Sequence, residues 1–210
     1  MAPTGRPGHN RGQRLPVELL SEGDMRALMA ALSCRSSSGL RSRALIAVMW
    51  RAGLRVSEAL ALLPRHVDLG AGAIVVVRGK GGRSRTVGID PGGAGIVGAW
   101  LERRMSLGPG RSAPLFCTLD GRGGVSAQQT RAMLARAAAS AGIAKRVHPH
   151  ALRHRCAWEL AVEEGMPVTV VQAQLGHASL ATTHRYLNHI APADLLARSR
   201  NRQMPTLPPG

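Results

Sequence analysis

Lysine is one of the scarcest reactive side chains in this 210-residue sequence. Lysine and arginine together number 28, but only Lys80 and Lys145 are lysines, which leaves 26 arginines. Lys80 stands in a glycine-rich stretch between two β-branched runs, so we expect it at the tip of a hairpin. Arginine is effectively always protonated, whereas a lysine with a lowered pKa can give up its proton. We therefore interpret Lys80 as a candidate general acid, with a solvent-exposed turn as the simpler alternative.

Histidine and arginine are densest in residues 148–154, which have the sequence HPHALRH. The proline suits the start of a helix, so His150 and Arg153 share one face in its first turn, where free N–H groups favour a phosphate. His150 and His154 also have the i,i+4 spacing of zinc-binding HExxH helices. Ala151 stands where that motif needs a glutamate, so we favour a phosphate site over a metal site.

Four more residues have types that suit catalysis, although each signal is weak alone. Arg55 and Glu58 stand three apart between two apolar segments, where an ordinary ion pair is the simpler explanation. His177 follows the end of a predicted helix, where a structural histidine is the common case. Tyr186 is the only tyrosine in the chain, which suggests that a hydroxyl group is needed there.

The overall charge indicates a polyanionic partner. The chain has a formal net charge of +16, while 44% of its residues are hydrophobic, so it is not a disordered polycation. Nucleic acid is the usual partner of such a surface, although an arginine-rich composition inherited from a GC-rich genome is an alternative. With one tyrosine and one phenylalanine, stacking on single-stranded bases is not favoured. We therefore expect double-stranded DNA.

Composition also limits the compartment. No apolar run is long enough to span a membrane, and the polar N-terminus lacks the apolar region of a secretory signal. Cys34, Cys117 and Cys156 are odd in number and widely spaced, which is typical of reduced thiols in a cytoplasmic protein.

The apolar pattern predicts a single α+β domain, mainly α-helical, with one small antiparallel sheet. A Ser21–Asp24 capping box begins the first helix, and residues 34–40 form a Ser/Gly loop. The predicted helices cover residues 22–33, 41–52, 57–64, 91–105, 126–142, 149–165 and 167–176, with a further helix from 179, and the predicted strands cover 74–77 and 86–89.

In combination and in this order, these residues resemble the tyrosine recombinase family of phage integrases and Xer-type recombinases. The matching stretches are GLRVSEAL, RGKGGRSRTVGI, HPHALRHRCA and QAQLGHASLATTHRYLNH. The resemblance covers about residues 17–190 and implies the mainly helical catalytic fold of that family.

The resemblance also implies a chemical role for each matching residue. Tyr186 would attack a DNA phosphate, forming a 3′-phosphotyrosyl bond and freeing a 5′-hydroxyl. Arg55 and Arg153 would hold the non-bridging oxygens, and His177 would donate another hydrogen bond. Because the bond energy is conserved, the family's strand exchange needs no external energy source, and the resemblance implies no metal ion or other cofactor.

The remaining matches concern proton transfer and support. Lys80 would protonate the leaving 5′-oxygen, and His150 would take the tyrosine proton. Glu58 matches the acidic position of the family, which is more often supporting than chemical.

We expect three segments along the chain. Residues 1–16 form a flexible basic arm, residues 17–190 a catalytic domain, and residues 191–210 a tail that could exchange a helix between protomers. Most family members have an N-terminal core-binding domain, and here we expect only the arm in that place. The predicted DNA contacts are the arginines of the arm and the hairpin, namely Arg6, Arg11, Arg14, Arg78, Arg83 and Arg85.

The sequence therefore predicts a site-specific DNA recombinase of bacterial or phage type, for example one that integrates or excises a mobile element. It would act on the nucleoid in the cytoplasm, as a homo-oligomer, a tetramer on DNA, with accessory or partner recombinases possible. The alternatives are a type IB topoisomerase-like nicking-closing enzyme and a non-cleaving DNA-binding accessory or regulatory protein.

Overall fold

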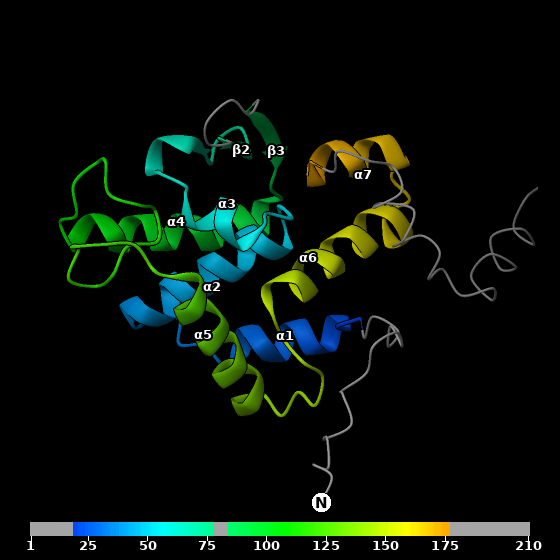
Figure 1. The fold of residues 1–210 in the computed structure, drawn as a ribbon, viewed down its shortest axis with the longest axis horizontal. Coiled ribbons are helices and arrows are strands. Elements are labelled where there is room, and N and C mark those ends of the chain that lie inside the picture. The colour runs from blue at the N-terminus through cyan, green and yellow to red at the C-terminus, as the bar shows by residue number, and fades with distance from the viewer. Residues whose placement is uncertain (1–18, 78–83, 177–210) are drawn as a thin grey trace, which may run out of the picture.

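Helix α2 (Ser37–Trp50) lies at the centre of the fold, with the other elements around it (Figure 1). The computed structural model describes residues 19–77 and 84–176. Every residue from Ala44 to Met49 is buried, so α2 is covered on all sides, as a helix of continuous apolar sequence must be. Helix α4 (Pro91–Ser106) packs along one side of α2 and helix α6 (Pro149–Trp158) along another. Helix α2 therefore sets the positions of the elements that carry the candidate site.

Helix α1 (Glu22–Ala30) begins with the predicted capping box, which is confirmed. The Ser21 hydroxyl accepts from the backbone N–H of Asp24 at 3.1 Å, and the Asp24 carboxylate accepts from the N–H of Ser21 at 2.7 Å. Lys145 Nζ donates to the same carboxylate at 2.8 Å and to the carbonyl of Leu19 at 3.0 Å. The entry of the chain into the domain is thereby tied to the segment between α5 and α6.

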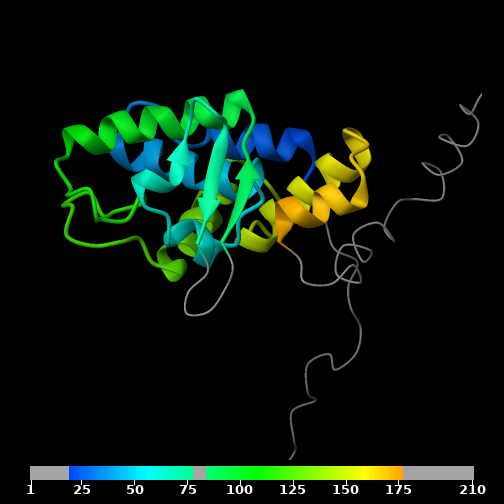
Figure 2. The same cartoon turned by 90° about the horizontal axis from the view of Figure 1, so that it is seen from above.

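The sheet contains three short antiparallel strands in the order β1-β2-β3 (Figure 2). Strands β2 (Ala73–Val76) and β3 (Arg85–Gly88) confirm the two predicted strands, each shifted by one residue. Strand β1 (Val67–Asp68), which follows the 3₁₀ turn η1 (Pro64–His66), was not predicted, because two residues show no alternation.

The remaining helices match the predicted ones except at some ends. They are α3 (Val56–Leu60), α4 (Pro91–Ser106), α5 (Ala127–Ser140), α6 (Pro149–Trp158) and α7 (Val168–Leu175). The predicted loop over 34–40 is wrong at its end, because the Ser36 hydroxyl caps α2 by accepting from the N–H of Gly39. The predicted helix over 57–64 is also wrong at its end, since α3 stops at Leu60.

One predicted helix changes type part-way. The segment 149–165 is α-helical only to Trp158 and continues as the π-helical turn η2 (Glu159–Glu163). Glu159 is 5% exposed, and its carboxylate accepts hydrogen bonds from Trp50, Arg51 and Arg155. The wider π turn coincides with this inward-facing glutamate, a typical setting for such a turn.

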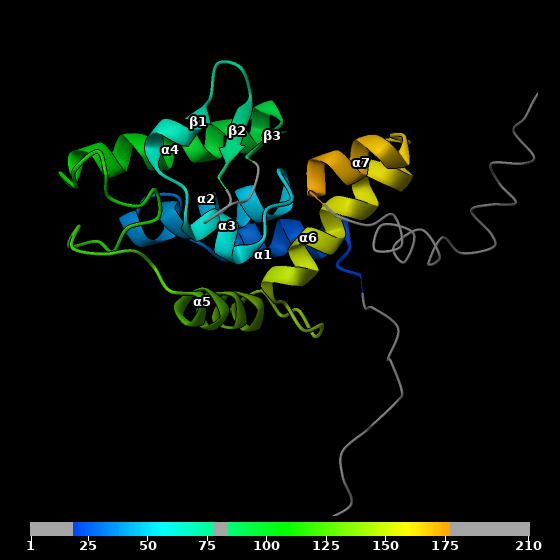
Figure 3. The same ribbon diagram turned by 45° about the horizontal axis from the view of Figure 1, so that its top comes forward.

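Helix α7 is attached to the edge of the sheet (Figure 3). The Gln174 amide accepts from the N–H of Gly88 at 3.0 Å and donates to its carbonyl at 2.7 Å, so it pairs with the open side of β3. The same amide donates to the carbonyl of Ala52 at 3.3 Å. As predicted, α7 ends at Gly176, which has φ of +63°.

These elements confirm the predicted fold class, mainly helical with a small antiparallel sheet. Within residues 19–77 and 84–176, no helix has the length and apolar character needed to cross a membrane.

The turn after α2 provides a test of the packing between α2, α6 and α7. Gly53 has φ of +68°, and a Cβ atom there would lie 2.7 Å from Leu175 Cδ2 and 3.1 Å from Cys156 Sγ. We expect Gly53→Ala to lower the free energy of unfolding by roughly 2 kcal/mol, measured by urea denaturation.

The matched control for this substitution is Gly95→Ala. Gly95 is exposed inside α4 with open space around its Cα, so alanine there should raise the free energy of unfolding by about 0.5–1 kcal/mol. Equal effects of the two substitutions would contradict the close packing at Gly53.

Candidate active site

The carboxylate of Glu58 holds two arginine side chains of the candidate site. Its Oε1 accepts from Nη1 of Arg55 and from Nη1 of Arg85, both at 2.9 Å. Its Oε2 accepts from Nη2 of Arg85 and from the backbone N–H of Arg55, also both at 2.9 Å. Arg153 Nη1 lies 3.9 Å from the same Oε2. One acidic group thus compensates three nearby guanidinium groups.

This arrangement stabilises the charged form of Glu58. Burial alone raises the pKa of the carboxyl group, since only 11% of the side chain is exposed. The hydrogen bonds and charges of Arg85 and Arg55 outweigh burial and lower the pKa from 4.5 to about 2. Glu58 is therefore ionised at any pH where the protein would work.

Arg153 is held almost entirely inside the protein, with 2% of its side chain exposed. It donates through Nη1 to the carbonyl of Gly53 and through Nη2 to the carbonyl of Leu175 at 2.5 Å. These carbonyls belong to the turn after α2 and to the last turn of α7. The guanidinium group of α6 is therefore fixed by two neighbouring elements as well as by Glu58.

Arg55 occupies the N-cap position of α3 and is the more accessible of the two predicted clamp arginines. Its side chain is 41% exposed, and its Nη2 donates to the carbonyl of Gly176 at 3.4 Å. The predicted pairing of Arg55 with Glu58 is confirmed, and it leaves part of the guanidinium group turned toward solvent.

His150 lies beside two other histidines in the first turn of α6. Its ring centroid is 4.0 Å from that of His154, edge-on, and 6.5 Å from that of His148. The residue is exposed at the surface, but partial burial of its ring and the charges of Arg153 and Arg55 lower its pKa. His150 is thus neutral near pH 7 and able to accept a proton.

His148 has a structural function at the same helix. Its Nδ1 accepts from the N–H of Ala151 at 3.3 Å and so caps α6. Burial and the nearby charge of Arg146 lower the pKa of His148, which keeps the ring neutral as this cap requires.

These side chains share one cavity of about 320 Å³. It is lined by Arg55, Val56, Arg131, Arg146, His148, Pro149, His150 and Arg153. Among the residues that the structure describes, no carboxylate belongs to this lining, so four guanidinium groups and two imidazoles face a common space. Guanidinium groups match the oxygens of a phosphate geometrically, and the cavity is suited to a phosphodiester.

Arg131 of α5 and Arg146 were not selected from the sequence. In a chain with 26 arginines, the residue type alone gives no signal, and only the fold brings Arg131 close to Arg55. Across the described parts of the chain, neither residue forms a salt bridge or side-chain hydrogen bond, so both charges remain available.

The structure brings together only part of the predicted site. Arg55, Glu58, His150 and Arg153 converge as described above. The other predicted residues lie outside the described residues, namely Arg6, Arg11, Arg14, Arg78, Lys80, Arg83, His177 and Tyr186.

Arg85 is the one predicted DNA contact within the described residues. Its side chain is 15% exposed, and its two Nη atoms bind Glu58. A contact between Arg85 and DNA stays a prediction. In the structure, Arg85 binds the carboxylate of Glu58.

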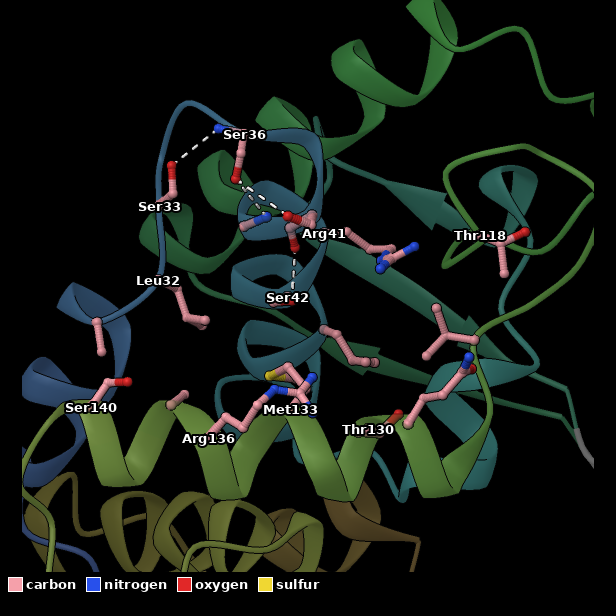
Figure 4. Close-up of a pocket in the computed structure, with 17 residues that line it drawn as sticks. Leu32, Ser33, Ser36, Arg41, Ser42, Thr118, Thr130, Met133, Arg136 and Ser140 are labelled. Atoms are coloured by element: carbon pink, nitrogen blue, oxygen red, sulfur yellow. Dashed lines mark hydrogen bonds between the residues drawn. The ribbon is translucent and has the colours of Figure 1, made fainter.

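A second cavity, of about 560 Å³, lies between the α1–α2 turn, α2, α5 and the loop at Thr118 (Figure 4). Its serine hydroxyl groups are engaged locally: Ser33 and Ser36 accept from backbone N–H groups, and Ser42 donates to the carbonyl of Ser38. Arg41 donates to the carbonyl of Cys117 at 2.8 Å. No residue of this lining also lines the cavity at Arg55 and His150.

Within residues 19–77 and 84–176, no three His, Cys, Asp or Glu side chains are arranged to hold a metal ion. Cys156 lies next to Gly53, and burial raises the pKa of its thiol to about 12. The thiol is therefore protonated, and it packs against Gly53 and donates a weak hydrogen bond to the carbonyl of Arg51 at 4.0 Å.

Sequence comparison identifies the family. The phage integrase family model matches residues 18–192. The chain belongs to the phage integrase family. A tyrosine recombinase XerD of Ralstonia nicotianae is 40% identical over 184 residues, which cover 85% of this chain and 57% of the relative. The chain thus spans less than two thirds of the length of such curated relatives.

Solved structures of integrase-family proteins share the fold. The crystal structure of the XerA recombinase has a TM-score of 0.77 and 30% identity, covering 91% of this chain and 68% of that one. XerH, a site-specific recombinase solved on its palindromic difH substrate as a post-cleavage complex, has a TM-score of 0.71 and 25% identity. That match covers 87% of this chain and 52% of XerH.

The lowered pKa of Glu58 predicts a pH-dependent loss of stability in this integrase-family domain. A depressed carboxyl pKa stabilises the folded state above the unfolded pKa, and the effect is lost as the pH falls through the folded value. Glu58→Gln should lower the free energy of unfolding at pH 7 by roughly 3 kcal/mol. The difference from wild type should shrink between pH 4.5 and about 2.

Urea denaturation at a series of pH values measures this difference. Glu102→Gln is the control, because Glu102 is exposed on α4 and has no ion pair among the described residues. A loss for Glu58→Gln that stays constant down to pH 2 would show that the carboxylate does not act through its charge.

Proposed function

We propose that this chain is the catalytic region of a site-specific DNA recombinase that cuts and rejoins strands through a 3′-phosphotyrosyl intermediate. The observation that carries this proposal is the cavity in which Arg55, Arg153 and His150 meet, with no carboxylate from residues 19–77 or 84–176 in its lining. The named XerD and XerH relatives, the latter solved on its DNA substrate, support the assignment.

The proposed reaction begins with the phosphate in this cavity. Arg55 and Arg153 bind the non-bridging oxygens, where negative charge increases in the pentacoordinate transition state. Two guanidinium groups held in advance by Glu58 and by backbone carbonyls need no reorganisation during the reaction. His177 supplies a further hydrogen bond in this proposal.

Tyr186 then attacks the phosphorus while its proton passes to His150, which is neutral near pH 7. The bond from phosphorus to the 5′-oxygen breaks, and Lys80 gives its proton to that oxygen. The reverse reaction with the 5′-hydroxyl of another strand completes the exchange. The reaction requires no external energy source, because one phosphodiester replaces another.

The remaining parts of the proposal concern partners. The substrate is duplex DNA of the nucleoid, in the cytoplasm, and the working form is a homo-oligomer, a tetramer, on that DNA with possible partner recombinases. The arginines of the arm 1–16, together with Arg78 and Arg83 of the hairpin, contact DNA phosphates outside the cavity. The catalytic domain spans 17–190, and the tail 191–210 joins neighbouring protomers.

A suicide substrate tests the chemistry directly. The substrate is a nicked duplex carrying the target site of the recombinase, and the readout is a protein–DNA band that resists denaturant. Wild type should form the band, Tyr186→Phe should form none, and Lys80→Arg should form it at least 10²-fold more slowly, since arginine cannot release a proton.

Three outcomes contradict parts of this proposal. No band with wild type would indicate a non-cleaving DNA-binding protein. A band on any sequence, with supercoil relaxation and no strand exchange, would indicate a type IB topoisomerase-like enzyme. Unchanged cleavage by Lys80→Arg would remove Lys80 from the role of the acid.

The two unpaired arginines of the cavity give a second prediction. Arg131→Ala and Arg146→Ala should each weaken DNA binding and reduce the slope of log K against log salt by about 1, because each charge displaces a counterion from a phosphate. Fluorescence anisotropy over a salt series measures this slope.

Arg111→Ala is the control, because Arg111 is exposed in the loop between α4 and α5 and does not line the cavity. Equal slopes for wild type and both cavity variants would exclude Arg131 and Arg146 from phosphate contact.

A further inference from the structure

The side chain of Arg85 binds a carboxylate, although its position in the hairpin predicted a contact with DNA. It is the first residue of β3, and both of its Nη atoms donate to Glu58, one to each carboxylate oxygen, at 2.9 Å. Its Nε is buried with no hydrogen-bond partner among the described residues. The guanidinium group is therefore held by Glu58 and by packing, with 15% of the side chain exposed.

This bidentate pairing limits how Arg55 can bind the same carboxylate. Because Arg85 occupies both oxygens of Glu58, Arg55 contacts the carboxylate through only one side-chain nitrogen, Nη1. A free carboxylate would favour a two-point bond with the Arg55 guanidinium group. Arg85 thus keeps Nε and Nη2 of Arg55 off the carboxylate, and of these two atoms Nη2 donates to the carbonyl of Gly176.

Arg85 also lies against the end of α7. A Cβ atom on Gly176 would lie 2.6 Å from both Cζ and Nε of Arg85, so the guanidinium group packs directly on the backbone there. The carbonyl of Gly176 in turn accepts from Arg55 Nη2 at 3.4 Å. One side chain from the sheet therefore contacts Glu58 and α7, the two features that also contact Arg55.

We propose that Arg85 is a positioning residue that acts through Glu58 to keep Arg55 turned toward the scissile phosphate. This inference rests on the proposed function, since the effect on Arg55 matters only if a phosphate is cleaved in the cavity. It links the sheet, whose β2–β3 connection contains Lys80, to the arginine clamp. Arg85 contributes no contact to the DNA itself.

The test separates positioning from DNA contact by measuring binding and chemistry independently. The variants are Arg85→Gln and Arg85→Lys, and Arg111→Gln is the control. Each is assayed for DNA affinity over a salt series and for single-turnover formation of the covalent adduct at saturating suicide duplex.

We expect both Arg85 variants to bind DNA within about twofold of wild type with an unchanged salt slope, because no phosphate contact is lost. Adduct formation at saturating DNA should fall by about 10²-fold for Arg85→Gln, the size expected when a clamp is misplaced. The rate of adduct formation in Arg85→Lys should stay below a tenth of the wild-type rate, since an ammonium group cannot bind both oxygens of Glu58.

A double-mutant cycle shows whether the effect passes through Glu58. Adding Arg85→Gln to Glu58→Gln should lower the rate of adduct formation only a little further, because the carboxylate that Arg85 binds is already absent. Urea unfolding of each variant identifies any protein that has lost its fold. Arg85→Lys keeps the positive charge beside Glu58, so it separates the effect of the bidentate geometry from the effect of losing that charge.

Two results would overturn this inference. A salt slope smaller by about 1, with adduct formation restored at saturating DNA, would make Arg85 a DNA contact instead. Adduct formation at the wild-type rate in Arg85→Gln would show that Glu58 positions Arg55 alone. If wild type itself forms no adduct, the proposed function fails, and that result is seen before any Arg85 variant is compared.

Discussion

The structure around the candidate site depends on keeping one permanently charged side chain, Arg153, inside the protein. A guanidinium group that is 2% exposed loses nearly all of its water, so the protein must supply its hydrogen-bond acceptors. Two are carbonyls, from Gly53 after α2 and Leu175 at the end of α7, and the nearby charge of Glu58 adds to them. The turn at Gly53 and the end of α7 are therefore held at fixed positions relative to α6.

The same constraint explains why Glu58 is the one carboxylate that the described residues place among these arginines. Glu58 is ionised and shared by three arginines, which compensates part of their charge without reaching the cavity lining. A carboxylate in the lining would repel a phosphate, whereas the available charges of Arg131 and Arg146 attract one. The network thus combines buried charges that are paired with cavity charges that have no ion-pair partner in the part of the chain that the structure describes.

The sequence predicted the local features better than the contacts between distant elements. The Ser21 capping box and the end of α7 at Gly176 depend on a few neighbouring residues, so their patterns were sufficient. The pairing of Arg55 with Glu58 is also local. Arg85, by contrast, meets Glu58 across 27 positions, and its location in a basic hairpin favoured a DNA contact. The π turn at Glu159 depends on a carboxylate whose partners include Trp50 of α2, so no local pattern indicated it.

Helix α6 is held at two points, and this determines which part of it faces the cavity. At its far end the buried Glu159 accepts from Arg51 at 2.6 Å and from Arg155 at 2.7 Å, while Arg51 also binds Asp90 at the start of α4 at 2.7 Å. At its near end Arg153 is fixed by two carbonyls. A helix anchored at two points along its axis has little freedom to slide or rotate, so its first turn holds His150 at the cavity in a constant orientation. Such preorganisation is what a phosphoryl-transfer site needs, because its arginines act mainly by being in position before charge develops.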